Sequence, residues 1–161
     1  MENYLSKHNS EVFEQAELSQ TNIRFAVLGD SHLSTLGYDS INKVYILDQS
    51  GNTYKRILQQ VTSSNPRFVI HGGDCVGKTT VGRPPEEKYK AFRNVTKGVL
   101  KNKPVFFAIG NWDRPSLFKQ YISPRIRGIS SIPGTNGKVK LVILDNADGT
   151  FHPEDINLLK S

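Results

Sequence analysis

The stretch RFVIHGGDCV, residues 67–76, places a short apolar run directly before two glycines and an aspartate. The same arrangement recurs in FAVLGDSHL, residues 25–33, and in VFFAIGNWD, residues 105–113. Short runs that are rich in Val, Ile and Phe and nearly continuous in apolarity are typical of strands buried on both faces. We therefore expect four strands, at Ile23–Leu28, Arg67–His71, Val105–Ile109 and Val139–Leu144.

Amphipathic stretches between these runs indicate helices, because their apolar residues recur with helical spacing. The first helix should begin near Asn52, a favourable N-cap residue. Its apolar face would consist of Tyr54, Ile57, Leu58 and Val61. A second helical face follows Pro84-Pro85 and would consist of Tyr89, Phe92, Val95 and Val99.

A third helix should begin at Pro153, since proline is favoured in the first turn, and should bury Ile156 and Leu159. Strands that alternate with helices predict an α/β fold. In such sheets ligands bind at the carboxyl ends of the strands. The polar residues that follow each apolar run are therefore the place to look for a functional site.

Composition limits the function classes. The chain has 161 residues, with 21 Lys and Arg against 15 Asp and Glu, which gives a formal charge of +6. The basic residues are scattered along the sequence, so we expect a solvated basic surface and not a nucleic-acid-binding stripe. Cys75 is the only cysteine, which excludes an intrachain disulfide and a zinc site built on paired cysteines.

Residues 1–22 are polar and should form an arm outside the folded domain, which would span residues 23–161. This segment lacks the basic start and apolar run of a secretory signal. No apolar run in the chain approaches the ~20 residues that a membrane-spanning helix needs. We therefore expect a cytoplasmic protein without a membrane span.

Metal-binding side chains follow three of the expected strands. Asp30 and His32 come after the first strand, Asp74 after the second and Asn111 after the third. A carboxylate combined with an imidazole suits Mn, Fe or Zn better than Ca, which prefers oxygen ligands. Each cluster alone is a weak signal, but three in succession at strand ends predict one shared site.

The three stretches quoted above resemble, in order, the D-x-H, G-D and G-N-H-D/E signature blocks of the calcineurin-like metallophosphoesterases. The similarity extends over about residues 23–160, nearly the whole chain. It implies a β-sandwich flanked by helices in αββα order, which would be incomplete in this chain. It also implies hydrolysis of phosphate mono- or diesters at a dinuclear metal site, by in-line attack of a metal-activated hydroxide on phosphorus.

The resemblance assigns roles residue by residue. Asp30 and His32 would bind the first metal ion, Asp74 would bridge both ions, and Asn111 would bind the second through its amide oxygen. Two divalent ions, Mn, Fe or Zn, would be the cofactors and a phosphate ester the substrate. Asp74 and Asn111 are therefore counted among the catalytic residues.

Trp112 and Asp113 of the third block are also predicted to be catalytic residues, although the block departs from the family pattern at Trp112. Trp112 stands where the family usually has a histidine that protonates the leaving group or steadies the phosphate. An indole N–H donates hydrogen bonds but is no acid at ordinary pH. Asp113 would normally orient that histidine, and it is here equally well explained as a structural turn residue.

The family completes its site with further histidines, including a G-H-x-H block, that this sequence lacks. Besides His32 the chain holds His8, His71 and His152. We expect His8 in the polar arm, His71 packed in its strand and His152 at the start of a helix. The expectation is a truncated chain or a fragment, which would be a poor phosphoesterase by itself.

Two other functions compete with this interpretation. Gly72 to Thr79 satisfies the G-x-x-x-x-G-K-T pattern of a P-loop after a strand. Pro84-Pro85 soon afterwards would shorten its helix, and this alternative leaves Asp30 and His32 unexplained. A catalytically impaired binding protein on the metallophosphoesterase fold is the second alternative, favoured by Trp112 and by the missing histidines.

Overall fold

The computed structural model describes residues 23–77, 84–132, 135, 137 and 139–161. Its centre is a parallel sheet of three strands, β1 (Phe25–Leu28), β4 (Phe68–His71) and β5 (Val105–Phe107), with β4 in the middle. All three lie within the ranges predicted from the apolar runs, trimmed by one or two residues. Because the strands are parallel, the loops that follow them emerge at the same edge of the sheet.

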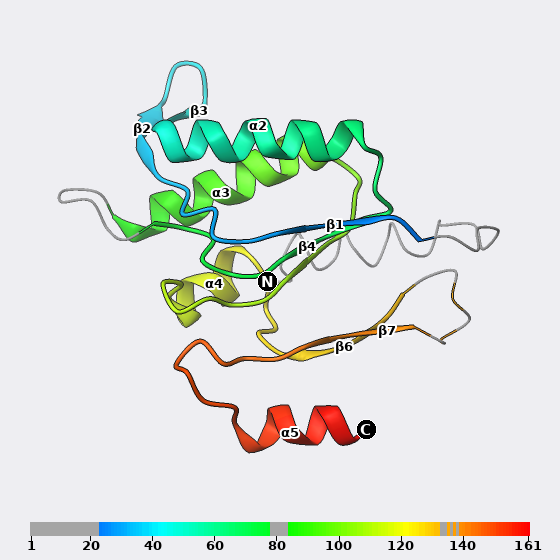
Figure 1. The fold of residues 1–161 in the computed structure, drawn as a ribbon. Coiled ribbons are helices and arrows are strands. Elements are labelled where there is room, and N and C mark those ends of the chain that lie inside the picture. Colours follow the sequence, from blue (N-terminus) through cyan, green and yellow to red (C-terminus); the bar gives the residue numbers. More distant parts are fainter. Residues whose placement is uncertain (1–22, 78–83, 133–134, 136, 138) are drawn as a thin grey trace.

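Two long helices cover one face of this sheet, α2 (Gln49–Ser63) and α3 (Pro85–Leu100) (Figure 1). Between them and the sheet lies the main core, which includes Leu58, Val69, Phe92 and Phe107. α3 begins at the predicted place, with Pro85 in its first turn.

The expected start of the first helix was wrong. α2 begins one turn before Asn52, and its N-cap is Asp48, whose carboxylate accepts a hydrogen bond from Gly51 N–H at 2.9 Å. Asp is as good an N-cap as Asn, and the strand that ends at Leu47 delivers Asp48 to this position. The predicted apolar face is also narrower, because Ile57 is 39% exposed while Tyr54 and Leu58 are buried.

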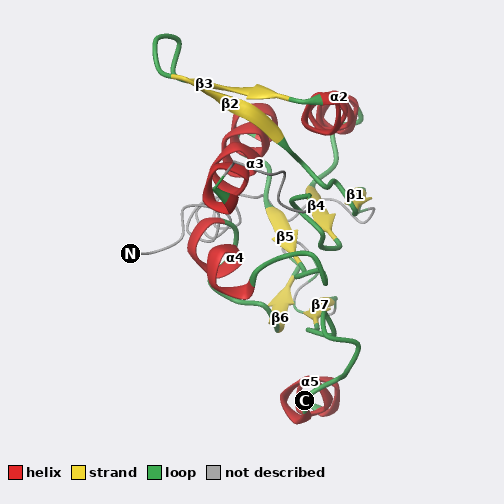
Figure 2. Ribbon diagram, turned by 90° about the vertical axis from the view of Figure 1, so that its left-hand side faces the viewer, coloured by secondary structure: helices red, strands yellow, loops and turns green. Residues whose placement is uncertain are grey.

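An antiparallel hairpin between β1 and α2 was not predicted. It pairs β2 (Thr35–Asp39) with β3 (Val44–Leu47) and carries an irregularity in register between Thr35 and Gly37. It lies beside the ends of α2 and α3, away from the central sheet (Figure 2). Its exposed apolar residues are Leu36, Tyr38, Val44 and Ile46. The hairpin therefore lacks the continuous run of buried apolar residues from which the other strands were predicted.

A second strand pair lies on the other face of the sheet. β6 (Gly128–Ser131) and β7 (Lys140–Ile143) are antiparallel, and β7 is the predicted fourth strand. Leu141 and Ile143 pack against a small core of Phe68, Phe106 and Ile132. The layers therefore follow in the order helices, sheet, strand pair and helix, which is the αββα arrangement expected for the fold (Figures 1 and 2).

Two helices complete the described chain, the short α4 (Pro115–Tyr121) and α5 (Pro153–Lys160). α5 begins at Pro153 as predicted, with His152 as its N-cap. The prediction of its buried face was wrong, because Ile156 is 39% and Leu159 59% exposed. A polar contact holds this helix instead.

That contact centres on Asp155, which is fully buried. Its carboxylate accepts hydrogen bonds from Asp145 N–H at 2.9 Å and from Arg127 Nε at 3.1 Å. The hydrogen bond from Asp145 lowers the pKa of Asp155, so the carboxylate stays charged and pairs with Arg127. Within the described residues, no helix is long and apolar enough to cross a bilayer.

Candidate metal centre

Two of the predicted site loops run side by side at the carboxyl edge of the central sheet. The N–H of Asp30, after β1, donates to Gly73 O at 3.2 Å, and the N–H of His32 donates to Asp74 O at 2.9 Å. These backbone hydrogen bonds continue the pairing of β1 with β4 beyond the strands. Asp30, His32 and Asp74 are thereby brought to one place, as the sequence predicted.

All three of these residues have left-handed backbone conformations, with φ of 49° at Asp30, 41° at His32 and 50° at Asp74. Such φ values cost non-glycine residues about 1–3 kcal/mol each and concentrate at functional sites. The turns direct three polar side chains toward one another where extended strands would have separated them. Nothing in the sequence pattern indicated this strain.

The donor atoms of this group converge closely. His32 Nε2 lies 3.9 Å from Asp30 Oδ1 and 3.9 Å from Asp74 Oδ2, and all three donors lie within 4.8 Å of one another. A separation of 3.9 Å is too long for a hydrogen bond. It fits two ligands of a single ion, because metal–ligand bonds of about 2.0–2.2 Å place such donors up to about 4.4 Å apart.

His32 faces both carboxylates with Nε2, the nitrogen that an ion between the three side chains would bind. Its Nδ1 is buried and has no hydrogen-bond partner among the described residues, and its Nε2 is beyond hydrogen-bond range of both carboxylates. Two carboxylates and an imidazole that approach without hydrogen bonds between them are a chemically suitable set for Mn, Fe or Zn.

Asp74 is held in place by the loop that follows β5. The backbone N–H of Trp112 donates to Asp74 Oδ1 at 2.9 Å. Gly110 lies so close to Asp74 that a Cβ at this position would overlap the carboxylate, and a Cβ at Gly73 would be 2.6 Å from Gly110 N. The glycines of the second and third clusters therefore allow two loops to touch at the Asp74 carboxylate.

A family model for calcineurin-like phosphoesterases matches residues 23–159. The chain belongs to the calcineurin-like phosphoesterase family. The match runs through all three loops of the candidate centre and confirms the resemblance drawn from the three sequence stretches. The αββα layers and the parallel central sheet are the fold that this membership implies.

In this phosphoesterase Trp112 supports the centre with its ring as well as its backbone. The Trp112 and His32 rings meet edge to face, with their centroids 4.5 Å apart and an interplanar angle of 61°. Edge-to-face contacts are the favoured geometry for aromatic pairs. Trp112 is 38% exposed, so one side of the indole faces solvent beside the candidate ligands.

Asn111, the fourth predicted ligand, is an exposed residue of the turn after β5. The residues on either side of it, Gly110 and Trp112, both lie against Asp74. The structure thus brings the backbone of Asn111 to the edge of the centre. Its role as a ligand stays a prediction.

Asp113 faces the backbone of the phosphoesterase and not the cluster of donors. Its carboxylate accepts from Cys75 N–H at 3.1 Å and from Gly110 N–H at 3.0 Å, and Tyr89 Oη donates to it at 3.5 Å. Burial raises the pKa of Asp113, and the hydrogen bonds from Gly110 and Cys75 oppose that rise. These contacts fasten the loop after β4 to the loop after β5.

A second connection between the site loops, the hydrogen bond between Ser31 and His71, was not predicted from the sequence. Ser31 Oγ lies 3.0 Å from His71 Nε2 and donates to Cys75 O at 2.9 Å, while His71 Nδ1 accepts from Gly73 N–H at 3.3 Å. This pattern places the imidazole proton on Nε2. The expectation that His71 is packed in its strand is confirmed, and a histidine within an otherwise apolar run was the available signal.

The P-loop alternative finds no support in the described part of its motif. A P-loop leaves backbone N–H groups free to hold phosphates. Here Gly72 N–H donates to Leu28 O, Cys75 N–H to Asp113, and Gly77 N–H to Leu33 O. Lys78 and Thr79 lie outside the described residues.

A cleft of about 540 Å³ opens beside the candidate centre. One wall is the loop that carries Asp30 and His32, and the other is the N-terminal half of α2. On α2, Gln49, Thr53 and Ile57 are spaced by four residues, so they form one stripe along this wall. A substrate group bound next to the donors would meet this stripe.

Proposed function

We propose that this calcineurin-like phosphoesterase hydrolyses phosphate mono- or diesters at a dinuclear site built from Asp30, His32, Asp74 and Asn111. The observation that carries the proposal is that donor atoms of two carboxylates and an imidazole lie within 4.8 Å of one another. His32 Nε2 is 3.9 Å from both carboxylates, which is too far for a hydrogen bond. Family membership supports the reaction class.

The residues would divide the work as follows. Asp30 and His32 would hold the first ion, Asp74 would bridge, and the Asn111 amide oxygen would hold the second. Bound divalent ions, Mn, Fe or Zn, lower the pKa of water and neutralise charge on the phosphate. Because Asn111 is a neutral ligand, the second ion should be the weaker bound.

Trp112 and Asp113 would support the site without transferring a proton. Trp112 orients Asp74 through its backbone N–H and His32 through its ring. Asp113 is a positioning residue, because its carboxylate bonds the backbones of both loops. Without an acid at position 112, esters with good leaving groups should be the better substrates.

The test is hydrolysis of p-nitrophenyl phosphate and bis-p-nitrophenyl phosphate with added Mn²⁺, together with Mn²⁺ binding by calorimetry. Asp74→Asn keeps the shape of the side chain and removes its charge. Asp148→Asn makes the same change at an exposed carboxylate that pairs with His152 and is not one of the proposed ligands. We expect slow turnover and Mn²⁺ binding that Asp74→Asn abolishes and Asp148→Asn preserves.

The same measurements decide the second candidate function, a metal-binding protein with impaired catalysis. Trp112 is the observation that favours it, since the indole cannot protonate a leaving group. Mn²⁺ binding that depends on Asp74, without any turnover of either ester, would support this function. Failure to bind Mn²⁺ would reject both.

A further inference from the structure

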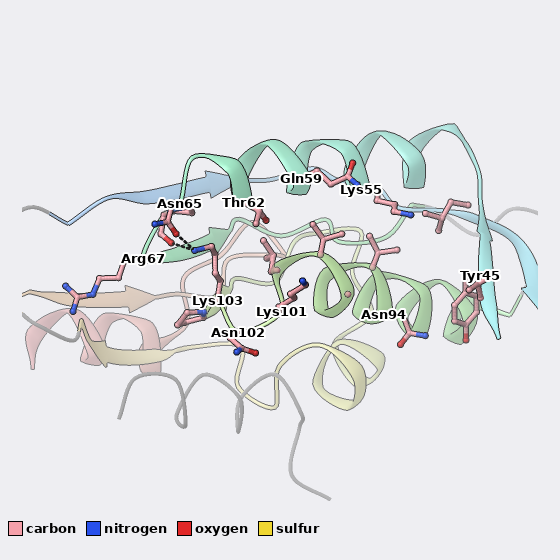
Figure 3. Close-up of a pocket in the computed structure, with 18 of the residues that line it drawn as sticks. Tyr45, Lys55, Gln59, Thr62, Asn65, Arg67, Asn94, Lys101, Asn102 and Lys103 are labelled. Carbon is pink, nitrogen blue, oxygen red and sulfur yellow. Dashed lines mark hydrogen bonds between the residues drawn. The ribbon is translucent and has the colours of Figure 1, made fainter. Parts of the chain in front are cut away.

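A large groove lies at the edge of the sheet opposite the candidate metal centre. It has a volume of about 1760 Å³ and runs between α2 and α3, from the β2–β3 hairpin to the turns that lead into β4 and β5 (Figure 3). Arg67 and Pro104 line it just before these strands begin, whereas Asp74 and Asn111 follow them. The groove is therefore separate from the residues of the proposed reaction.

The groove concentrates positive charge. Its cationic lining residues are Arg24, Lys43, Lys55, Arg67, Lys101 and Lys103. Among the described residues that line it there is no Asp or Glu, although the chain has 15 of them. The six cations are spread over 80 positions of sequence and come together only through the fold. A concave surface lined by one sign of charge attracts ligands of the opposite sign.

Two of these cations are held in place by neutral acceptors. Arg24 donates to Ser64 O at 3.2 Å, and Lys103 Nζ donates to Asn65 Oδ1 at 2.8 Å and to Pro66 O at 3.0 Å. Carbonyl and amide oxygens orient a cation without cancelling its charge. Figure 3 shows Arg67, Lys101 and Lys103 at the same end of the groove, with Lys55 on the α2 wall.

The rest of the lining is polar at the walls and apolar below them. Gln59 and Thr62 line the groove from α2, and Asn94 and Asn102 line it from α3 and the turn after it (Figure 3). Val95 and Val99 are partly buried. At the hairpin end Tyr45 lies against Tyr38, with ring centroids 4.9 Å apart. Cations, amides and an aromatic ring along one channel are the groups that bind a sugar–phosphate chain and stack on its bases.

We propose that this groove binds a single-stranded nucleic acid through its phosphate backbone. Unpaired bases can stack on an aromatic ring such as Tyr45, which lines the groove, whereas the bases of a duplex are already stacked on one another. An acidic peptide would match the charge but would leave the Tyr45 end and the amide side chains without a specific role. The proposal departs from the sequence expectation of a scattered basic surface, and it does not depend on hydrolysis at Asp74.

The test measures binding of fluorescein-labelled oligo(U) and oligo(dT) of about 20 nucleotides by anisotropy, with EDTA present so that metal ions play no part. The groove variant is Lys55→Gln with Lys101→Gln. The matched control is Lys140→Gln with Lys160→Gln, which removes the same charge from exposed positions of β7 and α5. Circular dichroism verifies that both variants are folded.

Titrations at about 50 and 200 mM salt should show affinity falling with salt, as expected when phosphates are neutralised. The groove variant should bind about tenfold more weakly or worse, with a salt slope smaller by about 1.4, since each phosphate contact contributes about 0.7. The control should bind like the wild type. Equal losses in both variants, or no binding at the lower salt, would overturn the proposal.

Two competitor ligands complete the design, poly-glutamate and phosphatidylserine-containing vesicles. If the groove variant lost binding to poly-glutamate as strongly as to the oligonucleotides, a general anion-binding groove would replace the nucleic-acid proposal. Vesicle binding that displaced the oligonucleotides and exceeded them in affinity would point to a membrane surface instead.

Discussion

The backbone N–H of Trp112 donates a 2.9 Å hydrogen bond to Asp74 Oδ1, so the proposed bridging carboxylate is oriented from the next strand's loop. The indole ring of the same residue lies edge-on against His32. One residue thus contacts two proposed ligands by different groups. Substitution at Trp112 changes the ring contact with His32 but leaves the backbone N–H available to Asp74. The effect of the ring contact can therefore be measured apart from that of the hydrogen bond.

Trp112→Ala should weaken Mn²⁺ binding by roughly two- to tenfold, because loss of one aromatic contact of about 0.5–1.5 kcal/mol frees the His32 ring. Trp112→Phe should bind Mn²⁺ nearly as the wild type does, since it keeps an aromatic ring. Calorimetry on the three proteins checks this. Equal affinity in Trp112→Ala and the wild type would show that the ring does not position His32.

Trp112→His should place a proton donor at position 112. General acid catalysis typically contributes 10²–10⁴-fold, and it matters most when the leaving group is poor. We expect a rise in kcat for phenyl phosphate of about tenfold or more, with a smaller effect on p-nitrophenyl phosphate. A uniform change for both substrates would argue against proton donation.

Gly110→Ala should damage the centre, because the new Cβ would overlap the Asp74 carboxylate. Either Asp74 or the backbone of the loop has to move, and strained small-to-large changes cost about 1–3 kcal/mol. Mn²⁺ affinity and stability should both fall. Gly98→Ala is the control, since a Cβ there meets nothing within 4 Å and alanine favours the helix by about 1 kcal/mol.

Stability should depend on pH through His71. Burial lowers the pKa of His71 from 6.5 to about 4, so the unfolded chain binds the extra proton more readily than the folded one. The contribution of neutral, buried His71 to the free energy of unfolding is complete above about pH 6.5, and it is lost as the pH falls toward about 4. This difference in pKa between the unfolded and the folded chain corresponds to roughly 3 kcal/mol of unfolding free energy.

Urea unfolding at about pH 7 and pH 5 checks this expectation. The wild type should lose about 2 kcal/mol of unfolding free energy between these values through His71. His71→Asn keeps an acceptor near Gly73 N–H and removes the titrating group. This variant should be less stable than the wild type at pH 7, but its free energy of unfolding should change less between pH 7 and pH 5. An unchanged slope in this variant would refute the assignment.

ATP and GTP should not bind tightly through Lys78. In the described part of the motif, the N–H groups of Gly72, Cys75 and Gly77 donate to protein acceptors, so they are not left for phosphate. Nucleotide titration with Mg²⁺, in the wild type and in Lys78→Ala, checks this. Micromolar affinity that disappears in the variant would restore the P-loop interpretation.

Much of the fold could be predicted because burial leaves a local trace in sequence. The runs before Gly29, Gly72 and Gly110 became the three strands of the parallel sheet, since continuous apolarity marks strands covered on both faces. The β2–β3 hairpin was not predicted because its apolar residues Leu36, Val44 and Ile46 are exposed. The buried face of α5 was misjudged because Asp155 binds Arg127, a partner 28 positions away.

The sequence by itself determined the three strands of the central sheet, the kinds of donor at their ends and hence the family. These follow from local periodicity and from residue types at fixed offsets. Only the tertiary structure decided the left-handed turns at Asp30, His32 and Asp74 and the hydrogen bond from Trp112. It also gathered the scattered cations into one groove. Such contacts depend on which loops and helix faces meet, and that is set by packing between distant segments.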